Sequence, residues 1–225
     1  MNRFYKLNDF NALAPTIVHK SHCNVFLAGV YYTYDTSGVP MNWIFLGLAA
    51  FLALTLFDVH KLKPIHPLFN GLFALGVGML VVATYGILSS EPWFTIPASP
   101  SAWIFAGLGL GEMIFALFLA LPFSATYVEQ PDQHPVISTG LYGICRHPGV
   151  WGFILYYLAA SVASGNGTLL VAGIMFSLAD VAHVTLQDRL FFRQTLIGYA
   201  DYQTRVPFLF FGWKDIKRAY LKEQS

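Results

Sequence analysis

The stretch GLYGICRHPGVWG, residues 140–152, places an arginine and a histidine side by side immediately before a long apolar run. Arg146 carries a permanent charge and His147 a titratable imidazole. Such groups are costly where a chain enters a membrane, and they are usually kept there for a function. Pro148 suits the first turn of a helix, because the N–H that it lacks would have no partner there. The stretch therefore predicts a helix that starts at the proline, with two polar side chains at its mouth.

The composition of the whole chain is that of a membrane protein. Of its 225 residues 56% are hydrophobic and 11% are charged, whereas soluble domains carry about 25% charged residues. A transmembrane helix needs about 20 mostly apolar residues, and five segments meet this requirement: 40–57, 67–87, 101–123, 147–164 and 168–186. We therefore expect an all-α integral membrane protein with about five transmembrane helices, a C-terminal helical hairpin and a cytoplasmic tail.

The chain divides into three parts on this interpretation. Residues 1–39 form an N-terminal extracytoplasmic or interfacial segment without a signal peptide, in which the apolar run 25–32 is too short to span a membrane. Residues 40–123 hold three spans, and residues 124–225 hold the hairpin and the tail. Within 101–123, the glycines at 107, 109 and 111 predict a face for close helix approach.

The distribution of positive charge predicts the orientation in the membrane. Lys61 and Lys63 lie between the first two spans, and Arg146 precedes the fourth. The last span is followed by a larger set of basic residues: Arg189, Arg193, Arg205, Lys214, Lys217, Arg218 and Lys222. Positive loops stay in the cytoplasm, so a multi-pass protein with a cytoplasmic C-terminus and a cytoplasmic active site is expected. The three basic residues before residue 21 oppose this orientation mildly.

A tight turn of Gly-Asn-Gly at 165–167 joins the last two spans. The two helices must then run antiparallel, which brings the start of one and the end of the other to the same membrane face. Arg146 and His147 are therefore expected near Asp188, with His183 about one turn deeper.

A polar stripe runs along the last span. Asp180, His183 and Gln187 fall at positions i, i+3 and i+7, and Asp188 continues Asp180 and Val184 in steps of four. A buried aspartate is costly unless it is paired. His183 fits a structural hydrogen-bonding role as well as a role in a site.

Other residues between 140 and 207 also occur at characteristic spacings. A glycine follows Pro148 by four residues, a Gly-x-Tyr precedes it, and two tyrosines and a Val-Pro follow Asp188. The pattern resembles the C-terminal signature of the isoprenylcysteine carboxyl methyltransferase-like and phospholipid methyltransferase membrane superfamily. The residues that carry the resemblance are Gly140, Tyr142, Arg146, His147, Pro148, Gly152, Gln187, Asp188, Tyr199, Tyr202, Val206 and Pro207.

The resemblance implies transfer of a methyl group from S-adenosylmethionine, in a pocket made by the hairpin and the following segment. The implied catalytic residues are Arg146, which would hold a carboxylate, and Asp188, which would pair with the cofactor or hold Arg146. The implied cofactor-binding residues are His147, Pro148, Gly152, Gln187, Tyr199 and Tyr202, with no metal. The acceptor would be lipophilic or a small molecule, of the isoprenylcysteine carboxylate, phospholipid or thiol type; membrane lipids are the other partners expected, and nucleic acid is not.

The sequence departs from the family pattern at the acidic pair, where Gln187 and Asp188 stand for two glutamates. We expect Asp188 alone to carry the acidic role, and a glutamate at position 187 to be tolerated. Two other hypotheses remain open: a haem- or metal-binding membrane protein that uses His147 and His183, and a non-catalytic membrane protein of the same fold. The identity of the acceptor and the oligomeric state also stay open.

Overall fold

The computed structural model describes residues 22–27, 30–35, 40–120 and 134–223. The chain separates after Val39 into two compact units. In the first, β1 (His22–Leu27) and β2 (Val30–Asp35) form an antiparallel hairpin in which Leu27 pairs with Val30. The run 25–32, which is too short to span a membrane, contributes to both strands. The tyrosines and the β-branched residues of β2 favour this extended conformation.

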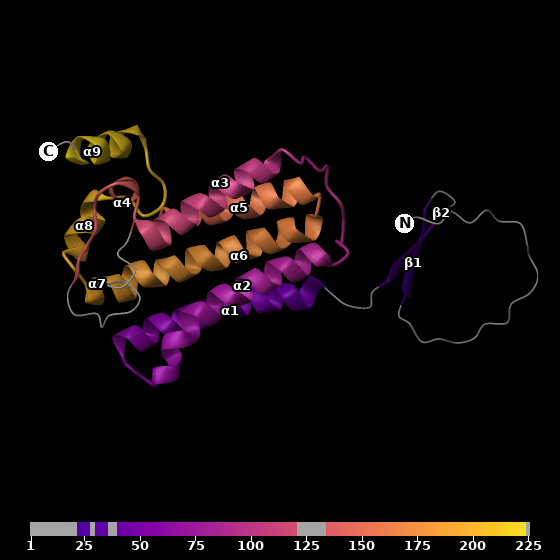
Figure 1. Ribbon diagram of the computed structural model, residues 1–225, viewed down its shortest axis with the longest axis horizontal. Coiled ribbons are helices and arrows are strands. Elements are labelled where there is room, and N and C mark those ends of the chain that lie inside the picture. The colour runs from indigo at the N-terminus through magenta and orange to yellow at the C-terminus, as the bar shows by residue number, and fades with distance from the viewer. Residues whose placement is uncertain (1–21, 28–29, 36–39, 121–133, 224–225) are drawn as a thin grey trace, which may run out of the picture. The chain divides into compact units, whose positions relative to one another are not determined.

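The second unit is a bundle of long apolar helices (Figure 1). Its members are α1 (Pro40–Leu62), η1 (Pro67–Gly71), α2 (Leu72–Ser89), α3 (Ala102–Ile114), the π-helical η2 (Phe115–Leu119), α5 (Gly149–Ser164), α6 (Gly167–Leu186), the π-helical η4 (Gln187–Phe191) and α7 (Phe192–Thr195).

Four helical segments of this bundle are long and apolar enough to cross a membrane: Met41–Leu62, Pro67–Ser89, Ala102–Leu119 and Gly167–Thr195. They correspond to four of the five predicted spans, and the predicted end at 121–123 lies outside the described residues. The remaining predicted span, 147–164, corresponds to α5, which has 16 residues. This is shorter than a full span, so the expected number of five is not confirmed.

The turn between α5 and α6 is held by its own residues and by the loop that joins α2 to α3. Gly165 takes a left-handed conformation with φ of 69°, which an L side chain rarely adopts, and ends α5. Asn166 caps α6, since its Oδ1 accepts a hydrogen bond from the Leu169 amide at 2.9 Å. The amide of Gly167 donates to the Phe94 carbonyl at 2.9 Å. The two helices are thereby fixed side by side.

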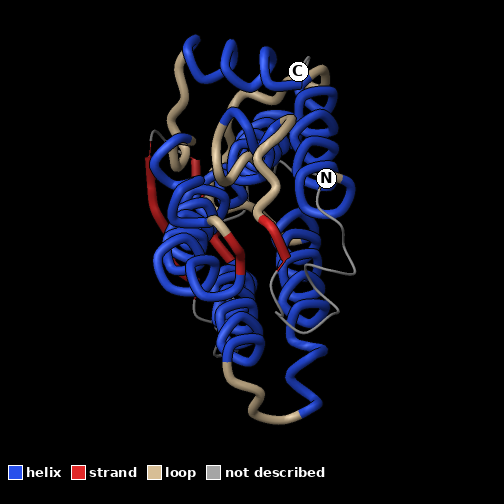
Figure 2. The backbone as a smooth tube through the Cα atoms, turned by 90° about the vertical axis from the view of Figure 1, so that its left-hand side faces the viewer, coloured by secondary structure: helices blue, strands red, loops and turns tan. Residues whose placement is uncertain are grey.

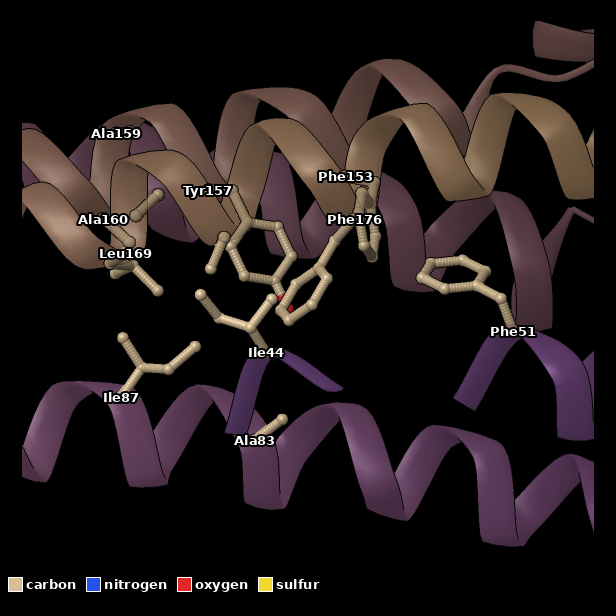
Figure 3. Packing of buried hydrophobic residues seen from close by; sticks show 12 residues of the cluster. Ile44, Phe51, Ala83, Ile87, Phe153, Tyr157, Ala159, Ala160, Leu169 and Phe176 are labelled. Atoms are coloured by element: carbon tan, nitrogen blue, oxygen red, sulfur yellow. The ribbon is translucent and has the colours of Figure 1, made fainter. Parts of the chain in front are cut away.

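The core of the bundle is aromatic and aliphatic, and Figure 3 shows its centre. Phe176 of α6 is fully buried, and its ring meets Tyr157 of α5 at 5.5 Å between centroids. The Tyr157 hydroxyl, which would be costly to bury alone, forms a hydrogen bond of 2.7 Å with Thr84 Oγ1 of α2. This hydrogen bond links the hairpin of α5 and α6 to helix α2.

Helices α3 and α5 approach each other closely through glycine. A Cβ atom at Gly152 would lie 2.6 Å from the Gly109 carbonyl oxygen and would collide with Glu112 Oε2. Gly107 and Gly111 face open space. The predicted close-approach face is therefore centred on Gly109, because residues 107 and 111 lie on the opposite side of the helix.

Short elements gather at one end of the bundle (Figure 1). They are β3 (His134–Pro135) and β4 (Leu196–Ile197), which pair in parallel, together with α4 (Leu141–Ile144), α8 (Tyr199–Arg205) and α9 (Trp213–Glu223). They lie where α5 begins and α6 ends.

Candidate functional site

Arg146 joins the two motifs that lie far apart in the sequence. Its backbone amide donates to the Pro207 carbonyl at 2.9 Å, and its Nη1 donates to the carbonyls of Gln203 and Val206, each at 2.9 Å. The carbonyls of Gln203 and Val206 lie in the last turn and at the C-cap of α8, where a cation is favoured because helix carbonyls there lack partners. The arginine therefore fixes α8 against the start of α5.

The same guanidinium reaches the carboxylate of Asp188 in η4. Its Nη2 donates to Oδ2 at 3.1 Å, and its Nε lies 2.8 Å from Oδ1 without forming a hydrogen bond. Tyr199 donates its hydroxyl to Oδ1 at 2.6 Å, and Gln203 donates Nε2 to Oδ2 at 2.8 Å. Asp188 is only 5% exposed, and this set of donors compensates its burial.

His147 lies on the other side of this carboxylate. Its Nε2 is 3.4 Å from Asp188 Oδ1, and its ring stacks on Phe192 at 6.0 Å and meets Phe208 edge-on at 5.0 Å. Burial lowers the pKa of His147, and the neighbouring carboxylate of Asp188 opposes this shift. A neutral imidazole near pH 7 follows from the net lowering.

The two tyrosines of α8, Tyr199 and Tyr202, stabilise this network. Tyr202 donates its hydroxyl to the Tyr142 carbonyl at 2.7 Å, which ties α8 to α4. Both tyrosines are buried. Burial raises the pKa of Tyr202, and burial together with the Asp188 carboxylate raises the pKa of Tyr199. Both side chains thus stay protonated donors at neutral pH.

An open cavity of about 690 Å³ lies beside the network. Its lining consists of Arg146, Thr185, Asp188, Arg189, Arg193, Ala200, Gln203, Thr204 and Phe208. Both predicted catalytic residues are in this lining. The predicted cofactor-binding residues lie outside it: His147, Pro148, Gly152, Gln187, Tyr199 and Tyr202. His147 and Tyr199 contact Asp188, which lines the cavity, whereas Gly152 packs against α3 and Gln187 against α1.

Gln187 belongs to a second polar cluster, which connects α6 with α1. Its Nε2 donates to Asp58 Oδ2 at 3.0 Å, and His183 Nε2 lies 3.6 Å from the same oxygen. The other ring nitrogen of His183 is 3.1 Å from Thr55 Oγ1. His183 and Gln187 of the polar stripe therefore connect α6 and η4 with α1 and do not line the cavity.

The cavity also contains residues that the sequence analysis did not single out. Thr185, Arg189 and Arg193 follow one another in steps of four along the end of α6, η4 and α7. The sequence could have predicted that these three side chains lie together, because residues four apart share a helix face. Arg193 Nε donates to Gln203 Oε1 at 2.7 Å. Arg189 and Arg193 are exposed at the mouth, so the cavity offers positive charge to an anionic group.

The two histidines of the haem or metal hypothesis, His147 and His183, lie in different polar clusters. Among the described residues, no group of three or more His, Cys, Asp or Glu side chains is placed to hold a metal ion. The Nε2 atoms of His147 and His183 face different carboxylates, Asp188 and Asp58. The two imidazoles therefore do not converge on a common ligand position.

Comparison of this chain with models of protein families, with curated proteins and with solved structures finds no match to any of them. The methyltransferase resemblance of the sequence therefore remains a prediction that rests on the residues themselves.

Proposed function

We propose that this protein is a membrane-embedded methyltransferase that uses S-adenosylmethionine and acts on a lipophilic or small-molecule acceptor. One observation carries the proposal. The Arg-His-Pro motif at 146–148 and the segment 199–207, which holds the two tyrosines and the Val-Pro, meet in one buried ion network. This network borders a cavity at the end of an apolar bundle. Distant motifs brought together around a cavity are typical of a functional site.

The lining of the cavity fits this cofactor in size and in chemistry. Its volume of about 690 Å³ falls in the range of small-molecule sites. The guanidinium groups of Arg189 and Arg193 suit the carboxylate of the methionine moiety. The hydroxyls of Thr185 and Thr204 donate to backbone carbonyls, and their oxygens can accept hydrogen bonds from the ribose hydroxyls. The Phe208 ring offers a face to the adenine.

Arg146 and Asp188 have a different role in this proposal from the one first expected. The Nη atoms of the arginine are committed to Gln203, Val206 and Asp188. Both residues therefore act mainly by positioning α8 and the cavity wall. The sulfonium of the cofactor supplies the reactive methyl group, and the chain orients the acceptor for in-line attack and excludes water. A carboxylate or thiolate acceptor needs no general base.

The cytoplasmic orientation belongs to the same proposal. Helices α7 and α8 lie at one end of the bundle (Figure 1). They hold Arg193 and Arg205, and Arg189 lies in η4 directly before α7. The positive-inside rule supports a cytoplasmic location for this end, where S-adenosylmethionine is available.

Calorimetric titration of the purified protein with S-adenosylmethionine tests the proposal. The double variant Arg189→Gln/Arg193→Gln should weaken binding about tenfold, because each exposed charge pair contributes up to ~1 kcal/mol. Arg205→Gln is the matched control, since Arg205 pairs with Asp201 on the exposed side of α8. Wild-type protein that binds no S-adenosylmethionine would overturn the proposal.

A further inference from the structure

Helix α5 is too short to reach across the hydrocarbon core of a membrane by itself. Its 16 residues extend ~24 Å, whereas the core is about 30 Å thick. Its antiparallel neighbour, the segment Gly167–Thr195, has 29 residues and continues beyond it. Measured from their shared turn at 165–167, the neighbour extends ~44 Å and α5 only ~24 Å, so at the end that carries the cavity α5 stops about 20 Å before its neighbour does.

The chain after α8 occupies this end of α5. We name Phe208–Trp213 the aromatic segment. Trp151, in the first turn of α5, donates its Nε1 to the Leu209 carbonyl at 3.1 Å. The Trp151 ring meets those of Phe210 and Phe211 edge-on, at 5.8 and 6.4 Å between centroids. The aromatic segment is thus fixed at the level of the first turn of α5.

The outer side of the aromatic segment consists of large exposed rings. Phe210 is 82% exposed, Phe211 44% and Trp213 69%. Exposed aromatic rings this close together are unfavourable in water. Aromatic side chains are, in contrast, enriched where a membrane protein meets the boundary between headgroups and acyl chains.

This aromatic surface continues a lipid-facing stripe. Trp151, Leu155, Leu158 and Val162 are all exposed, and their spacing of three and four residues puts them on one face of α5. The stripe ends at Trp151, where the rings of Phe210 and Phe211 extend it. The apolar surface therefore carries on into the region that α5 does not reach.

Helix α9 follows directly and is held in place. The Gly212 amide donates to Asp215 Oδ2 at 2.9 Å, and Arg218 Nη2 donates to the Gly143 carbonyl of α4 at 3.2 Å. In Figure 2 the helix next to the C-terminus, α9, runs along the upper edge of the bundle. Its residues Lys214 and Lys217 are exposed, and lysines just outside an aromatic layer suit the anionic headgroups of a bilayer.

We propose that Phe210, Phe211 and Trp213 form an interfacial anchor that inserts into the boundary between the headgroups and acyl chains of the leaflet next to the cavity. The anchor occupies the depth of the bilayer that α5 does not reach. Lys214 and Lys217 then lie among the lipid headgroups. The proposal concerns membrane contact, so it does not depend on the proposed methyl transfer.

Site-directed spin labelling of the full-length protein tests the anchor. Cys23→Ser leaves the buried Cys145, and burial raises the pKa of that thiol to about 11, so labelling is directed to an introduced cysteine. The variants are Phe210→Cys and Trp213→Cys, with Asp201→Cys on the exposed side of α8 as control. The protein is reconstituted in vesicles of equal parts phosphatidylcholine and phosphatidylglycerol.

The readout is the accessibility of each label to oxygen, which concentrates in lipid, and to a water-soluble nickel chelate. We expect the ratio of oxygen to nickel accessibility to be several-fold higher at 210 and 213 than at 201. Water-like accessibility at both aromatic positions would overturn the proposal. Low accessibility to both reagents would also overturn it, because it would show that protein covers the rings. If one of the two variants does not fold, the measurement at the other position decides the test.

Discussion

Gln187 donates its side-chain amide to Asp58 Oδ2 at 3.0 Å, across 129 residues of sequence. Its neighbour Asp188 instead turns to Arg146 and lines the cavity. Adjacent residues in a helix point about 100° apart, so Gln187 and Asp188 serve different interfaces. The pair is thus divided between helix packing and the site.

Replacing Gln187 with glutamate should destabilise the protein, contrary to the expectation from the sequence pattern. The new carboxylate would face Asp58 in place of an amide donor, and two like charges at this distance repel or force one of them to be protonated. We expect a loss of about 1–3 kcal/mol, measured as a lower thermal unfolding midpoint in detergent. Gln194→Glu, on the exposed side of α7, is the control, and equal midpoints would contradict the prediction.

Asp188→Asn should abolish methyl transfer and destabilise the site. The change leaves the Arg146 guanidinium without its counter-charge in a buried position, which typically costs about 3–5 kcal/mol. Incorporation of labelled methyl groups into a membrane extract measures the activity, and Asp201→Asn on the exposed side of α8 serves as control. Full activity in Asp188→Asn would show that this carboxylate is dispensable.

Arg146→Lys keeps the charge but loses the planar fork that reaches two carbonyls and a carboxylate. Methyl transfer should fall tenfold or more, which corresponds to about 1.4 kcal/mol or more in the activation free energy, while membrane insertion is kept. Arg205→Lys, at the exposed pair with Asp201, should have little effect. Wild-type turnover in Arg146→Lys would reduce Arg146 to an interfacial charge.

Gly152→Ala should loosen the contact between α3 and α5. The added methyl would meet the Gly109 carbonyl oxygen at 2.6 Å and collide with Glu112, and overpacking of this kind costs about 1–3 kcal/mol. Gly107→Ala is matched to it, because a Cβ there meets open space and should leave stability unchanged or slightly raised. Thermal unfolding in detergent compares the two, and equal midpoints would argue against close packing at Gly152.

Stability should fall as the pH drops below about 6.5, in part because of His147. Burial lowers the pKa of this side chain in the folded protein, so the unfolded chain binds more protons between the lowered pKa and about 6.5. The contribution is complete above that window and is lost as the pH falls through it. Unfolding midpoints of wild type and His147→Gln, measured from about pH 8 to about pH 5, should converge toward low pH; parallel curves would assign the dependence to other groups.

The long helices were predictable because apolar length alone specifies a span. The run 168–186, for example, matches α6 (Gly167–Leu186) closely. The helix α1 extends past the apolar run to Leu62, since Asp58 finds partners in Gln187 and His183 that the local sequence does not reveal.

The candidate site was predictable as a meeting of Arg146, His147 and Asp188, because the turn at 165–167 fixes the pairing of the helix ends. The lining of the cavity was not predictable. It depends on the path of the chain after Thr195, where α8 places Gln203 and Thr204 beside Arg189. Hydrogen bonds to backbone carbonyls, such as those of Arg146, leave no pattern in the side-chain sequence.

The bonds of Arg146 to Gln203 and Val206 have a consequence for how the protein is made. The arginine leaves the ribosome 57 and 60 residues before these two partners, which is a delay of ~3–12 s at usual rates of translation. During this interval the arginine pairs first with Asp188, which emerges 42 residues after it, and only later meets the carbonyls that tie it to α8. A polypeptide that ends before position 203 would therefore keep the ion pair but lack the two carbonyl acceptors that fix the wall of the cavity.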